Sequence, residues 1–249
     1  MQQSSNPEPV SSAFTLAACV LFGGFMGMMD DWIDLKWRYK AFMPLIAALP
    51  LIYYAQTINV RTSIILPFVG LVDFGIFYFY LIIPLIVMIV TNVVNQLGGL
   101  NGLESICPAI VIAGLMAFSP NYLLMVGPLM FWLILAAFNF SGKIFVGNTG
   151  SFAIGMTVAS FAVISDLKVN LFVSILPFIF NSALILLSAF FSGKKAAVTF
   201  DGKRLCSDRR KSLVTIITYH RPLTERQVVL IISCIVALFT LLGILIQML

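Results

Sequence analysis

Charged side chains are scarce in this chain: they make up 10% of its 249 residues, whereas 60% are apolar. With a mean hydropathy of +1.03, the composition lies far outside the range of soluble globular proteins. A chain with so little polar surface is instead suited to a bilayer, where helices pack against helices. We therefore predict an all-α fold, a polytopic transmembrane helical bundle.

Histidine and cysteine are also scarce. The four cysteines, at 19, 107, 206 and 234, lack the paired spacing of a disulfide framework or a metal site, and we interpret them as small packing residues. The single histidine, His220, lies in a basic loop and by itself indicates a surface residue. The chain also has no internal repeat, P-loop or dinucleotide-binding fingerprint.

Apolar segments long enough to cross a bilayer are abundant, given that a crossing takes about 20 residues. We predict about eight spans, at 13–29, 41–57, 74–93, 106–119, 122–140, 151–166, 170–191 and 227–248. Segment 59–73 is expected to be an irregular or interfacial connection. Residues 1–12 would form an extracytosolic tail, and 13–249 one transmembrane domain with a basic cytosolic loop at 193–226.

Basic residues gather on one side of this predicted topology. Thirteen of the fifteen fall in one set of loops, which comprises Lys36, Arg38, Lys40, Lys143 and the nine basic residues of loop 193–226. Because short cytosolic loops collect Lys and Arg, we expect this side to be cytosolic and both termini to lie outside. The net charge of +5 is thus a signal of topology and does not call for a nucleic-acid partner.

Three acids follow the uncharged run 13–29 at the cytosolic end of the first span: Asp30, Asp31 and Asp34. Positions 30 and 34 share a helical face if the helix continues. Acids at a helix C-terminus oppose the helix dipole, and neighbouring carboxylates disfavour joint ionisation. A positive group must compensate, either the basic residues at 36–40 or a bound cation. This favours a functional role over a helix end that merely dips into water.

The stretch 92–105, NVVNQLGGLNGLES, combines amides and glycines after the third span and contains no basic residue. Glycine allows the backbone to approach a ligand closely, and amide groups suit a metal or the edge of a base. A glycine-rich turn between two helices is the alternative interpretation.

The stretch 144–151, IFVGNTGS, precedes the sixth span. Its Gly-Asn-Thr-Gly-Ser run would offer backbone donors to a phosphate at the positive end of a helix. An N-cap role of Thr149 or Ser151 explains the same residues.

Loop 193–226 carries nine basic residues, for which anionic lipid, a diphosphate and water alone are the three alternatives. Taken together, acids, amides, a phosphate-binding turn and a basic loop on one membrane face indicate a site for an activated phosphate donor and a divalent metal.

Several of these segments are similar to the signature segments of a known enzyme family. GMMDDWIDLKWRYKAFMP, TNVVNQLGGLNGLES and IFVGNTGSFAIGMT resemble, in order, the signature blocks of the polyprenyl-phosphate N-acetylhexosamine-1-phosphate transferases. GGLNGLE and HRPLTERQVVL resemble the archaeal and eukaryotic branch, which acts on UDP-N-acetylglucosamine and dolichyl phosphate. The resemblance implies transfer of a sugar 1-phosphate to a lipid phosphate with release of UMP, the first step of lipid-linked glycan assembly.

The resemblance also implies roles for single residues. Asp30 and Asp31 would handle the acceptor phosphate and assist its attack, Asp34 would complete the acidic motif, and Lys40 would hold a phosphate. The cofactor would be Mg²⁺. The other expected roles are two metal ligands (Asn95 and Asn148), two residues that hold uracil by its edge and its face (Asn101 and Phe145), and a grip on diphosphate and sugar (Arg204, Arg209, Arg210, His220 and Arg221).

The expected partners are a UDP-sugar, a polyprenyl phosphate lipid and the membrane, without nucleic acid, and a homodimer stays an open alternative. The site would face the cytosol, in the cell membrane of an archaeon or the endoplasmic reticulum of a eukaryote. Two departures stand out: the chain begins after what would be the first two of about ten spans, and Asn148 stands where the family has aspartate. They leave open a catalytically impaired paralogue or fragment that acts as a membrane scaffold. A transporter is a further alternative, but it should show paired internal repeats with interrupted helices near the middle of the membrane.

Overall fold

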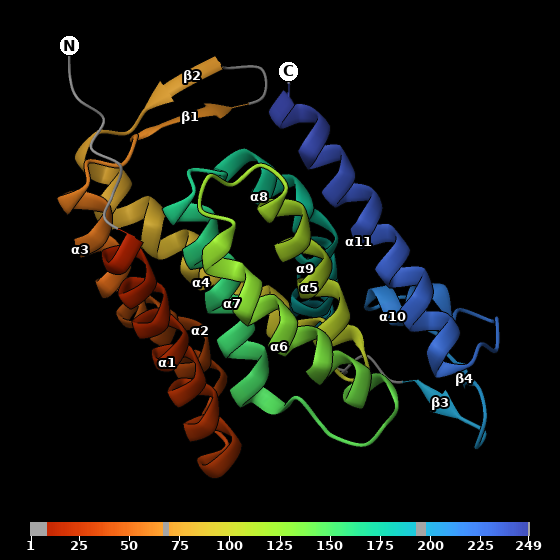
Figure 1. The fold of residues 1–249 in the computed structure, drawn as a ribbon. Helices are drawn as coiled ribbons and strands as arrows, with labels where there is room; N and C mark the ends of the chain where they lie inside the picture. Colours follow the sequence, from red (N-terminus) through yellow and green to blue (C-terminus); the bar gives the residue numbers. More distant parts are fainter. Residues whose placement is uncertain (1–8, 67–69, 193–197, 249) are drawn as a thin grey trace.

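The computed structural model describes residues 9–66, 70–192 and 198–248. Most of the expected N-terminal tail, as well as Lys194 and Lys195 of the basic loop, therefore lies outside the described residues. The described part is built from helices and two short antiparallel strand pairs (Figure 1).

The helices, in chain order, are α1 (Pro9–Ile33), α2 (Trp37–Ala47), α3 (Leu49–Thr57), the π-helix η1 (Tyr78–Ile82), α4 (Ile83–Gln96), α5 (Leu103–Met116), α6 (Leu123–Phe140), α7 (Gly147–Ile164), α8 (Lys168–Ser174), α9 (Leu176–Ser192), α10 (Leu213–Ile217) and α11 (Glu225–Met248). Strands β1 (Ser63–Leu66) and β2 (Gly70–Asp73) form one pair, and β3 (Thr199–Phe200) and β4 (Leu205–Cys206) form the other.

All eight apolar segments are helical, so the prediction of a helical, multi-pass membrane protein is confirmed. Within the described residues, however, five helices are long and apolar enough to span a bilayer, or six if α8 and α9, bent by 53°, form one span. Expected span 41–57 is split at Ala48, two residues before Pro50, which lies in the first turn of α3 and has no N–H to donate to the preceding turn. Helix α5 has only 14 residues.

Segment 59–73, expected to be an irregular or interfacial connection, contains a strand pair and is therefore not irregular. β1 and β2 pair antiparallel, with Ser63 opposite Asp73. The ammonium of Lys168, at the start of α8, donates to the carbonyl oxygens of Arg61 and Ser63 and pairs with Asp166 at 2.8 Å. These contacts join the hairpin to the helical bundle.

Small residues bring α1 directly against α7. A Cβ on Gly27 would lie 2.2 Å from the carbonyl oxygen of Asn148, and one on Gly23 would lie 2.5 Å from Met156 Cγ. On its other side, α7 meets α4, where a Cβ on Gly155 would lie 2.8 Å from the Cα of Thr91. Glycine thus permits the close helix contacts that are typical of membrane bundles, and it sets the register between the end of α1 and the start of α7.

The polar clusters occupy one end of the bundle. Figure 1 shows the start of α1, the end of α11 and the β1–β2 hairpin at the upper end. The end of α1, the starts of α5, α7 and α11 and the β3–β4 pair lie at the opposite end. The three stretches singled out in the sequence therefore meet at one face of the bundle.

Candidate active site

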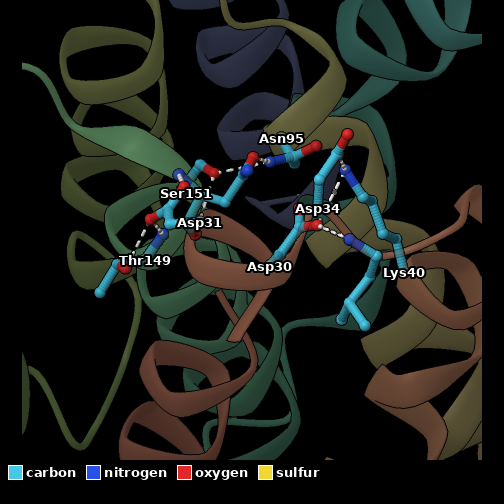
Figure 2. A network of polar contacts seen from close by, with 9 residues as sticks. Asp30, Asp31, Asp34, Lys40, Asn95, Thr149 and Ser151 are labelled. Atoms are coloured by element: carbon cyan, nitrogen blue, oxygen red, sulfur yellow. Dashed lines mark hydrogen bonds and ion pairs between the residues drawn. The ribbon is translucent and has the colours of Figure 1, made fainter. Parts of the chain in front are cut away.

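Adjacent carboxylates at the end of α1 point to different partners (Figure 2). Asp31 Oδ1 accepts from the backbone N–H of Asn148 at 3.0 Å, and Oδ2 accepts from the N–H and the hydroxyl of Thr149 at 2.9 and 2.7 Å. These are the first backbone donors of α7, which favour an anion. The donors that we expected a phosphate to use are therefore bonded to Asp31.

Asp30 faces Lys40 instead. It is 3% exposed, and its Oδ1 accepts from the N–H of Leu35 at 3.0 Å and pairs with Lys40 Nζ at 2.8 Å. Its other oxygen, Oδ2, is buried and has no hydrogen-bond partner in the described part of the chain. A buried carboxylate oxygen without a partner is costly, which makes Oδ2 a candidate contact for a substrate or a metal.

Lys40 also reaches Asp34, whose Oδ1 lies 3.3 Å from Nζ. The condition for a shared helical face, that the first helix continues through Asp34, is not met, because α1 ends at Ile33 and Asp34 adopts a left-handed φ of 44°. The two acids share a counter-ion, not a helical face. Burial lowers the pKa of Lys40, but the hydrogen bonds and negative charges of Asp30 and Asp34 outweigh it and raise this pKa above its ordinary value. Lys40 is thus the compensating charge.

The two asparagines expected to bind a metal lie in contact. Asn95, near the end of α4, donates through Nδ2 to Asn148 Oδ1 and to Ser151 Oγ, each at 2.8 Å. Since Asn148 also donates its backbone N–H to Asp31, the amide pair is joined to the acids. Asn148 Oδ1 thus already accepts one hydrogen bond, and an amide oxygen has a second lone pair for a further partner.

Two residues that the sequence analysis missed hold the glycine loop 97–102. Glu225 at the start of α11 accepts from the N–H of Asn101 at 2.7 Å. Buried Asn139 accepts from the N–H of Gly102 at 2.7 Å and donates to the carbonyl oxygen of Ile144 at 2.9 Å. Asn139 therefore fixes the loops that carry Asn101 and Phe145. The available signal was a lone amide in the otherwise apolar helix α6.

Phe145, expected to hold the face of uracil, is 88% exposed. Such exposure leaves its ring free to meet a ligand.

The expected grip on diphosphate and sugar is spread over the loop between α9 and α11. Arg210 and Arg221 line an open pocket together with Tyr219, whose ring packs on that of His220 at 4.2 Å between centroids. Arg209 pairs with Asp208 at 3.7 Å, and Arg204 follows the β3–β4 turn. Among the contacts of the described residues, none joins these five side chains to the acids of α1 or to the amide pair.

Comparison with known proteins identifies the family. Residues 13–166 match the model of glycosyl transferase family 4. The chain belongs to this family. The matched region contains the acids, the glycine loop and the start of α7, so the family match and the converging contacts concern the same part of the molecule.

Several relatives are similar over most of this chain. It is 30% identical to the putative UDP-N-acetylglucosamine–dolichyl-phosphate N-acetylglucosaminephosphotransferase of Saccharolobus solfataricus, over 96% of this chain and 76% of that protein. The corresponding enzyme of Schizosaccharomyces pombe is 30% identical, over 73% of this chain and 46% of the yeast protein. A phospho-N-acetylmuramoyl-pentapeptide-transferase of Kosmotoga olearia is 32% identical, over 74% and 63% of the two chains.

The site's donor atoms fit a hard divalent cation such as a family 4 transferase is expected to use. Asp30 Oδ2 is a buried oxygen without a partner, and the Asn95 and Asn148 amides lie together beside Asp31. The described residues contain no group of three or more His, Cys, Asp or Glu suited to a metal. Mg²⁺ usually takes only one or two carboxylates and completes its shell with water and substrate phosphates, so this set is compatible with it.

Proposed function

We propose that this protein transfers N-acetylglucosamine 1-phosphate from UDP-N-acetylglucosamine to a polyprenyl phosphate and releases UMP, as the names of its archaeal and yeast relatives suggest. The observation that carries the proposal is the convergence of Asp30, Lys40, Asn95 and Asn148 at one end of a membrane bundle. A lipid acceptor requires a site at this position, and a soluble donor can reach it.

In the proposed reaction, an oxygen of the lipid phosphate attacks the sugar-linked phosphorus of the donor. A new P–O–P bond forms, the bond between the two donor phosphates breaks, and UMP carries away the bridging oxygen. A phosphate monoester is already a competent nucleophile, so the protein mainly has to align the two phosphates and offset their charge.

Asp30 is the candidate group for the acceptor phosphate. Its Oδ2 lacks a partner, whereas both oxygens of Asp31 are engaged by α7. Asp30 would accept the remaining proton of the acceptor and orient the attacking oxygen, while Asp31 would keep the α1 end in register with α7. Lys40, bonded to Asp30 and Asp34, would add a positive charge for the incoming phosphates.

Asn95 and Asn148 would hold Mg²⁺ together with an acid of α1. When bound, this ion would neutralise charge on the diphosphate. Asn101 and Phe145 would bind uracil, on loops that Glu225 and Asn139 keep in place. Arg204, Arg209 and His220 would approach the diphosphate and sugar from the basic loop. Arg210 and Arg221 instead line an open pocket beside α10 and α11.

The excess of basic residues at this end supports a cytosolic site, in the cell membrane of an archaeon or in the endoplasmic reticulum.

The proposal is tested with the purified chain in lipid nanodiscs, supplied with UDP-N-acetylglucosamine, a polyprenyl phosphate and Mg²⁺. We expect UMP to appear only when all three are present, and Asp30→Asn to abolish its release while Asp34→Asn retains part of it. Binding of UDP-N-acetylglucosamine, followed by thermal shift, separates donor recognition from turnover. A folded chain that neither binds the donor nor releases UMP would contradict the proposal.

A further inference from the structure

An open pocket of about 680 Å³ lies between the basic loop, α10 and α11. Its polar lining comprises Arg210, Tyr219 and Arg221, and its apolar lining includes Ile217 of α10 and Ile231 of α11. The acids and amides of the proposed active site lie on other elements, α1, α4 and α7. The pocket lining shares no residue with the proposed site, although Arg209 and His220 are chain neighbours of Arg210 and Arg221.

The pocket straddles the boundary between loop and membrane. Ile231 is six residues after Glu225, the first residue of α11, which places it about 9 Å along a helix that rises about 1.5 Å per residue. Helix α11 is the most hydrophobic of the candidate spans, with a mean hydropathy of 3.1. Ile231 thus belongs to a helix that enters the bilayer, while the rest of the aliphatic lining and the arginines belong to the loop that precedes this helix.

The arginines are exposed and turned to a common opening. The guanidinium of Arg210 stacks over the ring of Tyr219 at 4.1 Å, which orients its planar fork. Neither Arg210 nor Arg221 forms an ion pair within the described residues, and the nearby acid Asp208 pairs with Arg209. Two guanidinium groups without acidic partners form a site for an anion, and their geometry suits a phosphate.

We propose that this pocket binds an anionic phospholipid of the bilayer, with its phosphate on Arg210 and Arg221 and an acyl chain along Ile217 and Ile231. A UDP-sugar matches the arginines but has no apolar part for the aliphatic wall. A zwitterionic lipid matches the wall but places a cation near two guanidinium groups. An anionic lipid satisfies both, and basic residues at the membrane surface attract such lipids.

The inference is tested by lipid binding alone, so it does not depend on turnover. The chain is purified in detergent, and native mass spectrometry measures its binding of phosphatidylglycerol and of phosphatidylcholine. The test variant is Arg210→Gln with Arg221→Gln. The matched control is Lys203→Gln with Arg204→Gln, which removes the same charge near the β3–β4 turn, outside the pocket lining.

We expect the wild type to prefer phosphatidylglycerol and the pocket variant to bind it roughly tenfold more weakly than the control does, since both variants lose two positive charges and only the pocket variant loses the guanidinium contacts to the phosphate. Equal losses in the two variants would reduce the effect to general charge attraction and overturn the proposal. Displacement of the lipid by UDP-N-acetylglucosamine, or by a polyprenyl phosphate, would assign the pocket to a substrate and overturn it as well.

A variant that fails to fold is recognised by its melting temperature without lipid. In that event Arg210→Lys with Arg221→Lys replaces it, because lysine keeps the charge and loses the planar fork. We expect this conservative variant to lose its preference for phosphatidylglycerol in part, and a fully retained preference would contradict a phosphate held by the two guanidinium groups.

Discussion

Asp31 on α1 accepts a hydrogen bond from the hydroxyl of Thr149 on α7 at 2.7 Å, although 118 residues separate the two in the sequence. The neighbouring acid Asp30 has its Oδ2 buried without a partner. Two adjacent aspartates of one motif thus have different surroundings: Asp31 is engaged by a helix N-terminus, and Asp30 is paired with Lys40 through one oxygen only. This division makes their contributions to stability and to turnover separable.

Asp30→Asn should abolish UMP release at a smaller cost in stability than Asp31→Asn, because the amide oxygen can still accept from the N–H of Leu35 and Lys40 keeps Asp34 as a partner. Asp31→Asn should lower stability by about 1 to 3 kcal/mol, since an amide can replace only part of three hydrogen bonds to a charged acceptor. Thermal unfolding in detergent, measured beside UMP release, checks both. Equal destabilisation by the two variants would refute the division of roles.

Thr149 is a positioning residue whose hydroxyl is the testable part. Thr149→Val keeps the shape and loses the bond to Asp31, whereas Thr149→Ser keeps the bond. We expect kcat to fall about tenfold for valine, the equivalent of about 1.4 kcal/mol, and serine to restore most of it. If serine and valine behave alike, the hydroxyl has no part in positioning Asp31.

Sequence patterns predicted the features that depend on local composition. Apolar runs located the long helical segments but not the short helix α10 inside the predicted basic loop, and the clustering of basic residues placed the acids, amides and glycine loop on one side. The missed features depend on contacts distant in sequence. Asn139 and Glu225 accept hydrogen bonds from the glycine loop, 37 and 124 residues away in the sequence, and no local sequence pattern indicates such partners. The end of α1 before Asp34 coincides with the ion pair to Lys40. The bend between α8 and α9 has a local cause, because it lies at Ile175, two residues before Pro177, which has no N–H to continue the helix.

Glu225 should affect donor recognition more than chemistry, because it holds the backbone of the loop that carries Asn101. We expect Glu225→Ala to raise KM for UDP-N-acetylglucosamine by about tenfold and to change kcat little, given a charge-assisted hydrogen bond worth about 1.5 kcal/mol. Glu225→Gln should give a KM for UDP-N-acetylglucosamine between those of the wild type and Glu225→Ala. Steady-state kinetics with the donor varied and the acceptor saturating provide the measurement, and a fall in kcat at constant KM would contradict this role.

Lys40 compensates a buried acid, so its loss should destabilise the fold as well as the reaction. Lys40→Met leaves Asp30 without its counter-ion, and we expect a loss of about 1 to 3 kcal/mol, less than for a fully buried pair because the Lys40 side chain is 28% exposed. The control is Asp34→Asn, whose side chain is 99% exposed and should cost little stability. Melting temperatures of the two variants decide the matter. A stable Lys40→Met variant would show that solvent reaches Asp30 and that Oδ2 is not a desolvated ligand site.

Asn148→Asp tests the proposed metal role of residue 148. The substitution adds an anionic oxygen beside the Asp31 carboxylate, which already accepts the backbone N–H of residue 148. Two neighbouring carboxylates repel without a cation, so the melting temperature should fall in the absence of metal and recover as Mg²⁺ is added. In the same titration the apparent affinity for Mg²⁺ should rise at least about tenfold, because a carboxylate replaces a neutral ligand. Asn148→Leu is the control, with lower stability and no response to metal. A melting temperature of Asn148→Asp that is independent of Mg²⁺ would exclude residue 148 as a ligand and leave its side chain as the acceptor that keeps Asn95 in place at the start of α7.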